Sequence, residues 1–202
     1  MIKRVFDIYF SILGIVFFLP VFLIISLLIR LDSKGPVFFL QDRVGLNQKI
    51  FKIIKFRTMN VNHNSKLTIT VIDDDRITRI GGFIRRFKID ELPELFNVLK
   101  GDMSFVGPRP DVPGYADKLQ GEDRNILKLR PGITSMASLK YAHEELLLSK
   151  VKDPVDYNNN VIYPDKVKMD LNYYYNHNIW IDIKVIFATI FLLKKSIFIK
   201  ND

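Results

Sequence analysis

An uncharged apolar segment near the N-terminus constrains this chain more than any other feature. Residues 8–29 read IYFSILGIVFFLPVFLIISLLI and contain no charged side chain. A helix rises about 1.5 Å per residue, so this segment roughly matches the bilayer's hydrocarbon core of about 30 Å. The run is too long for the apolar part of a typical signal peptide, and no A-x-A cleavage site follows it. We therefore predict a membrane-embedded helix.

Pro20 lies near the middle of this segment and predicts a bend. Proline removes one backbone donor and clashes with the carbonyl of Val16. Basic residues flank both ends of the segment: Lys3, Arg4, Arg30 and Lys34. The positive-inside rule therefore gives no direction across the membrane. Two topologies remain equally compatible: a re-entrant helix that bends at Pro20 and returns to the same face, or a kinked helix that spans the bilayer.

The rest of the chain is long enough for one folded domain. We predict a membrane part at residues 1–34 and a compact, mainly helical domain at residues 35–202. The absence of cysteine excludes disulfides, thiol catalysis and cysteine-ligated zinc. The net charge of +8 favours a polyanionic partner such as nucleic acid, anionic lipid or a phosphorylated substrate, although it also serves solubility.

Turn and periodicity signals divide this domain into short elements. Gly35-Pro36 marks a turn, and residues 37–41 then read as a strand that reverses at residues 42–45. Residues 50–59 read as a second strand, which predicts a short β-hairpin. Residues 60–75 are polar and predict a loop. Helical patterns cover residues 77–87, 90–99, 164–176 and 181–200, and the last of these suits either a core helix or one at the membrane interface.

Two adjacent carboxylates, Asp90 and Glu91, are the first candidates for chemistry. They open the predicted helix at residues 90–99, with Asp90 as its N-cap and Pro93 in its first turn. The positive end of a helix dipole favours an ionised carboxylate and attracts phosphate. An ionised Asp90 could attack phosphorus, while Glu91 could bind magnesium or handle a proton. The alternative is that Asp90 only caps the helix and Glu91 faces water.

Basic residues around the carboxylates form a second candidate group. Guanidinium forks bind phosphate through two parallel hydrogen bonds. The group consists of Arg85, Arg86, Lys88, Arg109 and Arg130. Arg109 lies between Pro108 and Pro110, so the backbone on both sides of it is restricted. We expect Arg85, the Pro-Arg-Pro loop and Arg130 to bind substrate; a solvated basic face is the alternative.

Other site classes have weaker support. The run from Asp73 to Asp75 could bind a metal, but it is more typical of a solvated loop. The three histidines, at positions 63, 143 and 177, have no ligand spacing, so we predict no zinc site. No phosphate-binding loop or dinucleotide fingerprint is present.

Several stretches together resemble one known family. They are residues 35–45 (GPVFFLQDRVG), 50–59 (IFKIIKFRTM), 75–110 (DRITRIGGFIRRFKIDELPELFNVLKGDMSFVGPRP) and 129–134 (LRPGIT), followed by Asp170, Tyr173 and residues 182–184. The chain is similar over nearly its whole length to the bacterial sugar transferases, also called small monotopic phosphoglycosyl transferases. The stretch at residues 75–110 is long and highly specific, so helix capping alone does not account for it.

The resemblance implies an α+β fold with a re-entrant helix bent at Pro20 and amphipathic helices at the membrane interface. Both ends of that helix would lie on the cytoplasmic face of a bacterial inner membrane. It further implies that Asp90 attacks the sugar-bearing phosphate of a UDP-sugar, that UMP leaves, and that polyprenyl phosphate then takes the phosphosugar. Mg²⁺ would lie at Asp90 and Glu91, with Arg85 and residues 108–110 on the nucleotide and phosphate side.

Two positions depart from the family pattern. Leu19 stands where members often have a serine before the bend proline, and residues 135–138 read Ser-Met-Ala-Ser where many have Gly-Trp-Ala-Gln. The sequence therefore does not identify the sugar.

Two rival functions remain. One is a conventional membrane glycosyltransferase that releases UDP. The other is a non-catalytic basic scaffold or nucleic-acid binder, which leaves residues 90–110 unexplained, so we expect no nucleic-acid partner. The oligomeric state stays open between monomer and homodimer.

Overall fold

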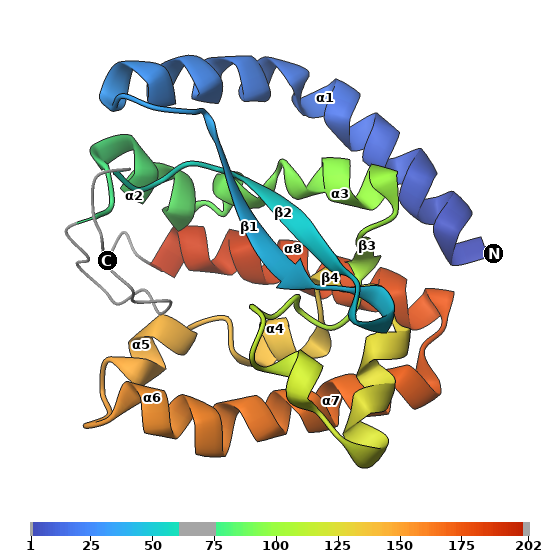
Figure 1. Cartoon of the computed structure of the whole chain (residues 1–202). Coiled ribbons are helices and arrows are strands. Elements are labelled where there is room, and N and C mark those ends of the chain that lie inside the picture. The colour runs from blue at the N-terminus through green and yellow to red at the C-terminus, as the bar shows by residue number, and fades with distance from the viewer. Residues whose placement is uncertain (1, 61–75, 200–202) are drawn as a thin grey trace.

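The computed structural model describes residues 2–60 and 76–199, so the predicted loop at residues 60–75, with its aspartates at 73–75, lies almost wholly outside the described residues. The described part is mostly helical with two small two-stranded sheets, which confirms the mainly helical α+β prediction (Figure 1). The helices are α1 (Ile2–Asp32), α2 (Arg79–Arg86), α3 (Glu94–Lys100), α4 (Met136–Lys140), α5 (Glu144–Leu148), α6 (Pro154–Tyr157), α7 (Tyr163–Asn176) and α8 (Ile179–Ile199). The strands are β1 (Phe38–Val44), β2 (Ile50–Phe56), β3 (Ser104–Val106) and β4 (Gly132–Thr134).

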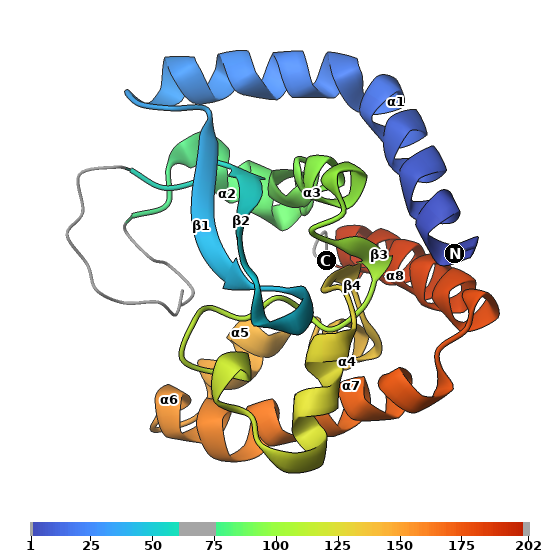
Figure 2. The same ribbon diagram turned by 45° about the vertical axis from the view of Figure 1, so that its right-hand side comes forward.

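The apolar N-terminal segment forms the single long helix α1, which contains Pro20. Within the described residues it is the one helix long and apolar enough to cross a membrane. Figures 1 and 2 show that α1 changes direction part-way along its length and lies over the rest of the molecule. Only a narrow stripe of its second half is buried: Phe22, Ile25 and Ile29 pack against Phe56 and Ile84. The three- and four-residue spacing of that stripe is the helical period.

The predicted β-hairpin is confirmed, but its turn lies elsewhere. Strands β1 and β2 pair antiparallel from Phe38 opposite Phe56 to Val44 opposite Ile50, so the predicted reversal at residues 42–45 is wrong. The chain reverses after Gly45, where Asn47 and Gln48 adopt left-handed φ angles of 52° and 65°. Polar residues at positions 41–43 resemble a turn in sequence, yet they continue the strand. The second strand ends at Phe56, three residues before the predicted end.

The segment that carries Asp90 also differs from the prediction. Residues Ile89–Glu91 form a short 3₁₀ turn, and α3 begins only at Glu94. Asp90 is therefore not the N-cap of α3. Lys88 enters the 3₁₀ turn with a left-handed φ of 56°, and Pro93 supplies no N–H, so regular α-helical bonding starts after it. Helix α3 ends at Lys100, one residue past the predicted end, and the Gly101 N–H binds the carbonyls of Asn97 and Val98.

A parallel strand pair that the sequence did not predict brings the Pro-Arg-Pro loop next to the segment around Arg130. Strand β3 pairs with β4, and this places the Pro108–Pro110 loop beside Arg130-Pro131. Gly107 and Gly132 face each other so closely that a Cβ on Gly107 would lie 2.2 Å from the Arg130 carbonyl oxygen, and one on Gly132 would lie 2.1 Å from the Gly107 nitrogen. Both positions therefore require glycine. The Pro-Arg-Pro loop and the Arg130-Pro131 segment meet because Gly107 and Gly132 allow this contact.

The C-terminal helices α7 and α8 pack against β3. Helices α7 and α8 match the predictions for residues 164–176 and 181–200 as far as residue 199. Val106 of β3 packs with Tyr173 of α7 and Val185 of α8 in one buried cluster. The same strand leads directly into the Pro-Arg-Pro loop, so these helices fix where that loop begins.

Candidate active site

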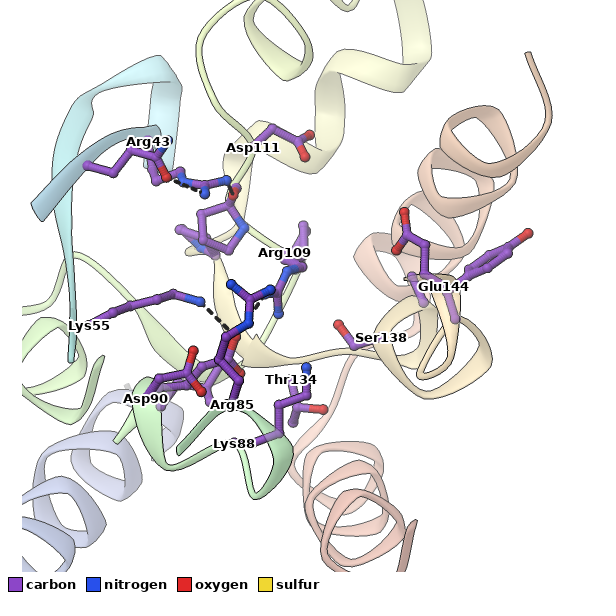
Figure 3. A pocket seen from close by; sticks show the side chains of 18 of the residues that line it. Arg43, Lys55, Arg85, Lys88, Asp90, Arg109, Asp111, Thr134, Ser138 and Glu144 are labelled. Atoms are coloured by element: carbon purple, nitrogen blue, oxygen red, sulfur yellow. Dashed lines mark hydrogen bonds and ion pairs between the residues drawn. The ribbon is translucent and has the colours of Figure 1, made fainter. Parts of the chain in front are cut away.

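A large open cavity of about 1930 Å³ lies between the hairpin, the Asp90 turn and the C-terminal helices. Asp90, Glu91, Arg85 and residues 108–110 all line it. Figure 3 shows the side chains of Lys55, Arg85, Asp90 and Arg109 directed towards one another in this cavity. The structure thus brings together most of the residues that the sequence nominated.

Glu91 is the most firmly held member of the site. Its Oε1 accepts a hydrogen bond of 2.7 Å from Lys55 Nζ and one of 2.8 Å from an Arg109 guanidinium nitrogen. Burial alone would raise the pKa of Glu91, but the charges of Arg109, Lys55 and Lys88 outweigh it. The pKa of Glu91 therefore lies well below its ordinary value. Glu91 is an ionised carboxylate that fixes two cations, and it does not face water.

Asp90 has a different environment from its neighbour. Its Oδ1 atom is buried and has no hydrogen-bond partner. Burial, followed by the like charge of Glu91, raises the pKa of Asp90. Three cations oppose that rise: Lys55, Lys88 and Arg85. The sequence predicted that a helix N-terminus would favour ionisation, and this is wrong, because Asp90 is not at the α3 N-cap and its burial acts in the opposite direction.

Arg109 owes its position to the loop that carries it. The pKa of Arg109 is raised, and the adjacent negative charge of Glu91 is the main cause. Arg43 on β1 donates a hydrogen bond of 2.9 Å to the Pro110 carbonyl, and the Val44 N–H donates one of 2.9 Å to the Asp111 carbonyl. The hairpin therefore holds one end of the Pro-Arg-Pro loop, and the β3–β4 pair holds the other.

Arg130 does not join the site. Its Nε donates a hydrogen bond of 2.9 Å to the Gly101 carbonyl at the end of α3, and Arg130 is not among the residues that line the cavity. A cation at a helix C-terminus stabilises the exposed carbonyls there. The position of Arg130 therefore gives no support to its predicted role in substrate binding.

The family model for bacterial sugar transferases matches residues 1–196 of this chain. The chain belongs to the bacterial sugar transferase family.

Three relatives of known name illustrate the range of the family. The chain is 39% identical over 98% of its length to the undecaprenyl-phosphate glucose phosphotransferase of Komagataeibacter xylinus, of which it covers 36%. It is 38% identical over 94% of its length to the UDP-N-acetylgalactosamine-undecaprenyl-phosphate N-acetylgalactosaminephosphotransferase of Aeromonas hydrophila, of which it covers 43%. It is also 38% identical over 94% of its length to the exopolysaccharide production protein PSS of Rhizobium leguminosarum, of which it covers 93%. The chain thus spans less than half of the first two relatives and nearly all of the third.

Sequence reasoning missed three residues of this sugar transferase site. Lys55 binds Glu91 and also lies 3.1 Å from Glu94 Oε1, and Glu94 is only 2% exposed. Burial and the charge of Glu91 raise the pKa of Glu94 to about 7. Arg43, the third, fixes the Pro-Arg-Pro loop. Lys55 could have been found, because it shares a strand face with buried Phe51 and Ile53, and a lysine on an otherwise buried face signals a partner.

The cavity continues past Arg109 to a second polar wall. Asp111 lies beyond Arg109 as seen from Asp90 (Figure 3), and Asp170, Tyr163 and Lys166 line the same side. Burial raises the pKa of Asp111 to about 6 and that of Asp170 to about 7; the charge of Asp111 adds to the latter. Lys166 forms an ion pair of 2.6 Å with Glu144 across the gap from α7 to α5.

The opposite side of the cavity is apolar and includes α1. The lining there includes Phe10, Phe18, Phe38, Leu95 and Ile190. A charged centre thus lies between a polar wall and an apolar wall that belongs partly to the candidate membrane helix. Such a site can receive one hydrophilic and one lipid-borne substrate.

The carboxylates are chemically suited to magnesium. Mg²⁺ commonly binds one or two protein carboxylates together with substrate phosphates and water. Asp90 and Glu91 supply two adjacent carboxylates, and the buried Oδ1 of Asp90 lacks a partner. No group of three or more His, Cys, Asp or Glu residues that could enclose a metal occurs in residues 2–60 and 76–199. The residues therefore fit an ion that is shared with a phosphorylated substrate.

Proposed function

We propose that this chain is a phosphoglycosyl transferase that moves a phosphosugar from a UDP-sugar to polyprenyl phosphate. The single observation that carries the proposal is the setting of Asp90: a half-buried carboxylate with one buried, unpartnered oxygen, in a cavity that also holds Lys55, Arg85 and Arg109. Cations placed around a reacting carboxylate suit phosphoryl transfer, where catalysis depends on positioning and charge stabilisation. The name of the Aeromonas relative includes a UDP-sugar and undecaprenyl phosphate, and that of the Komagataeibacter relative includes undecaprenyl phosphate, which supports these donor and acceptor classes.

In the first step an Asp90 oxygen attacks the phosphorus that carries the sugar. The bond from that phosphorus to the bridging oxygen breaks, and UMP leaves with the bond's electron pair. Arg109 and Arg85 bind the phosphate oxygens as charge develops, and Glu91 holds Arg109 in place. Because burial raises the pKa of Asp90, the opposing charges of Lys55, Lys88 and Arg85 also serve to keep it ionised.

In the second step an oxygen of polyprenyl phosphate attacks the phosphosugar on Asp90. The aspartyl–phosphorus bond breaks, which regenerates the carboxylate and gives a polyprenyl diphosphate sugar. The apolar wall formed by α1 and the hairpin suits the first isoprene units of the acceptor. Asp90 and Glu91 would hold Mg²⁺, which would neutralise phosphate charge when bound.

The contacts of α1 favour a re-entrant helix over a spanning one. Near its N-terminus Lys3 and Arg4 donate hydrogen bonds to the domain, and at its other end Arg57 donates to the carbonyls of Ser33 and Lys34. A helix that spans the bilayer would hold its two ends about 30 Å apart on opposite faces. Both ends of α1 instead contact the same domain, which supports α1 in one leaflet and the catalytic domain on a single face of the membrane. We place that face in the cytoplasm because the proposed donor is a UDP-sugar. Exposed Trp180, Phe187 and Phe191 on α8 support additional interfacial contact.

The decisive experiment identifies the nucleotide that is released. Purified protein is mixed with Mg²⁺, undecaprenyl phosphate and a panel of UDP-sugars that includes UDP-glucose and UDP-N-acetylgalactosamine. We expect UMP from at least one sugar and, without acceptor, a phosphosugar adduct on the peptide that contains Asp90. Asp90→Asn should abolish both signals, whereas Asp42→Asn, in an exposed ion pair with Lys52, should abolish neither. Release of UDP would contradict the proposal and favour a conventional glycosyltransferase.

A further inference from the structure

The first turns of α1 make a set of polar contacts that the proposed chemistry does not use. Lys3 Nζ donates hydrogen bonds to three acceptors: the Val106 carbonyl at 2.9 Å, the Tyr173 hydroxyl at 3.0 Å and Asp182 Oδ2 at 2.5 Å. An ammonium group has three protons, so its bonding capacity is filled. Tyr173 also donates to the other Asp182 oxygen. We call Lys3, Tyr173 and Asp182 the Lys3 cluster.

Burial makes the Lys3 cluster energetically significant. Asp182 is 2% exposed and Tyr173 is 7% exposed. Burial and the charge of Asp182 raise the pKa of Tyr173, so it remains a neutral donor. A carboxylate buried to this degree needs a cation, and Lys3 is the residue that supplies one. Removing either charge would leave the other without its partner.

The Lys3 cluster acts on a segment next to the candidate active site. Val106, whose carbonyl Lys3 binds, lies three residues before Arg109. One turn further along α1, Asp7 Oδ1 accepts hydrogen bonds from Ser104 Oγ at 3.1 Å and from the Phe105 N–H at 3.2 Å. The N-terminal end of α1 thus holds all three residues of β3, the strand that delivers the Pro-Arg-Pro loop.

The same end of α1 holds the helix that follows Glu91. Arg4 donates hydrogen bonds of 2.6 Å and 2.8 Å to the carbonyls of Val98 and Leu99 at the C-terminal end of α3. Because α3 begins three residues after Glu91, α1 contacts both segments whose side chains meet in the Glu91–Arg109 pair. A membrane helix placed in this way can affect a site that its polar residues do not touch.

We infer that Lys3, Tyr173 and Asp182 are positioning residues that couple the seating of α1 to the placement of Arg109 against Glu91. The catalytic importance of Arg109 rests on the proposed function, whereas the coupling of α1 to β3 does not. When the Lys3 cluster is intact, β3 is fixed and Arg109 meets Glu91. When it is broken, β3 loses a support, and the loop samples positions in which Arg109 is misplaced. Displacement of a catalytic group by about 1 Å can cost two orders of magnitude in rate.

The test combines a structural readout with a kinetic one on the full-length protein in lipid nanodiscs. Asp182→Asn should increase amide hydrogen exchange in peptides that cover residues 104–110 and leave exchange in the β1–β2 hairpin unchanged. It should lower kcat for UMP release at least tenfold while the KM for the UDP-sugar changes less than threefold, because the loop is misplaced and binding groups remain. Asp42→Asn removes an exposed carboxylate of the same type and should alter neither readout.

Lys3→Met and the Lys3→Met/Asp182→Asn double variant complete the design. If the two charges act as a unit, the double variant should lose no more activity than either single variant, since no unpaired charge remains. If Asp182→Asn does not fold, Tyr173→Phe removes one hydroxyl only and should produce a smaller change in the same direction in both readouts.

The outcomes separate this inference from the proposed function. Unchanged exchange at residues 104–110 overturns the coupling of α1 to β3. Increased exchange with an unchanged kcat, or with a raised KM alone, overturns the positioning of Arg109. A wild-type protein that releases no UMP contradicts the proposed function, and the exchange measurement then still decides whether α1 supports β3.

Discussion

Lys55 shows how one side chain can organise a catalytic centre. It lies on a strand face whose other residues are buried, and it bridges Glu91 and Glu94. Its own side chain is only 16% exposed. Lys55 is therefore the cation that Glu91 and Glu94 share, and Glu91 in turn holds Arg109. Strand β2 thus positions Lys55, Lys55 binds Glu91, and Glu91 binds Arg109 of the loop.

Replacing Lys55 should be costly in a way that replacing a neighbouring lysine is not. We expect Lys55→Met to lower the free energy of unfolding by about 3 kcal/mol, because two buried carboxylates lose their shared cation. Lys52 lies three residues closer to the hairpin tip, in an ion pair with Asp42 in which both side chains are more than half exposed. Lys52→Met should therefore cost less than about 1 kcal/mol. Denaturant unfolding in detergent at pH 8 measures both. Equal effects would contradict the bridging role of Lys55.

The second polar wall predicts a pH-dependent stability. The pKa of Asp170 is raised to about 7 and that of Asp111 to about 6, so the folded protein binds more protons than the unfolded chain above about pH 4. Stability should therefore fall as pH rises from about 4 to about 7. Asp170→Asn removes one of these proton-binding groups, so its unfolding free energy should fall less over that range. The difference should be on the order of 4 kcal/mol, because the pKa of Asp170 is raised from about 4 to about 7. Asp42→Asn should retain the wild-type profile, and coincident profiles for all three proteins would exclude this contribution.

At the scale of elements, the sequence predicted most helices and the hairpin, but it misplaced the hairpin turn and the start of α3. The strand at residues 38–44 continues through polar residues because Arg43 and Val44 are held by the Pro-Arg-Pro segment, which is distant in sequence. The turn at Ile89–Glu91 depends on a left-handed backbone conformation at Lys88, and no local sequence pattern predicts it. The parallel pairing of β3 with β4 is a tertiary contact between two segments in which the sequence predicted no strand.

The same distinction governs the site. Asp90, Glu91, Arg85 and Arg109 could be nominated because Pro and Gly restrict the chain near them and the family motif spans them. Arg130 stands beside Pro and Gly in the same manner, yet it binds the end of α3. Whether an arginine in a rigid loop points into a cavity depends on the packing of other elements, which local sequence does not encode. Magnesium at Asp90 and Glu91 stays a prediction.

Two adjacent glycines in α2 give a sharp test of close packing. A Cβ on Gly81 would lie 2.1 Å from the Thr58 carbonyl oxygen, whereas one on Gly82 would find only Ile77 Cγ2, at 3.9 Å. Gly81→Ala should therefore lower the thermal midpoint markedly, since α2 must move away from the backbone at Thr58. Gly82→Ala should be neutral or stabilising by up to about 1 kcal/mol, because alanine favours helix. If Gly81→Ala proved as stable as Gly82→Ala, the close approach of α2 would be wrong.

At the scale of the whole molecule, α1 is part of the domain's core as well as a membrane element. Its Phe22, Ile25 and Ile29 pack on the hairpin and α2, and its first turns hold β3 and α3. Most of its other side chains are exposed apolar residues that suit lipid. The chain therefore joins its lipid-facing and catalytic parts without a linker between them.

The contacts at both ends of α1 predict that both ends are reached from one side of the membrane. The chain contains no cysteine, so Ile2→Cys and Lys34→Cys each introduce a single thiol. A membrane-impermeant maleimide added to inverted vesicles should modify both variants, and added to right-side-out vesicles it should modify neither. Labelling of one variant from each side would establish a spanning helix instead.

The ion pair between Lys3 and Asp182 joins residues that are 179 positions apart. During synthesis α1 leaves the ribosome well before Asp182, so the cationic end of α1 must wait for 179 further residues before its partner emerges. At about 5–20 residues per second, that interval lasts on the order of ten seconds or more. Throughout it, the helix can associate with lipid while the strand before Arg109 lacks its support. Synthesis of α8 is thus required to complete the support of β3, and a chain interrupted before Asp182 would reach the membrane without that support.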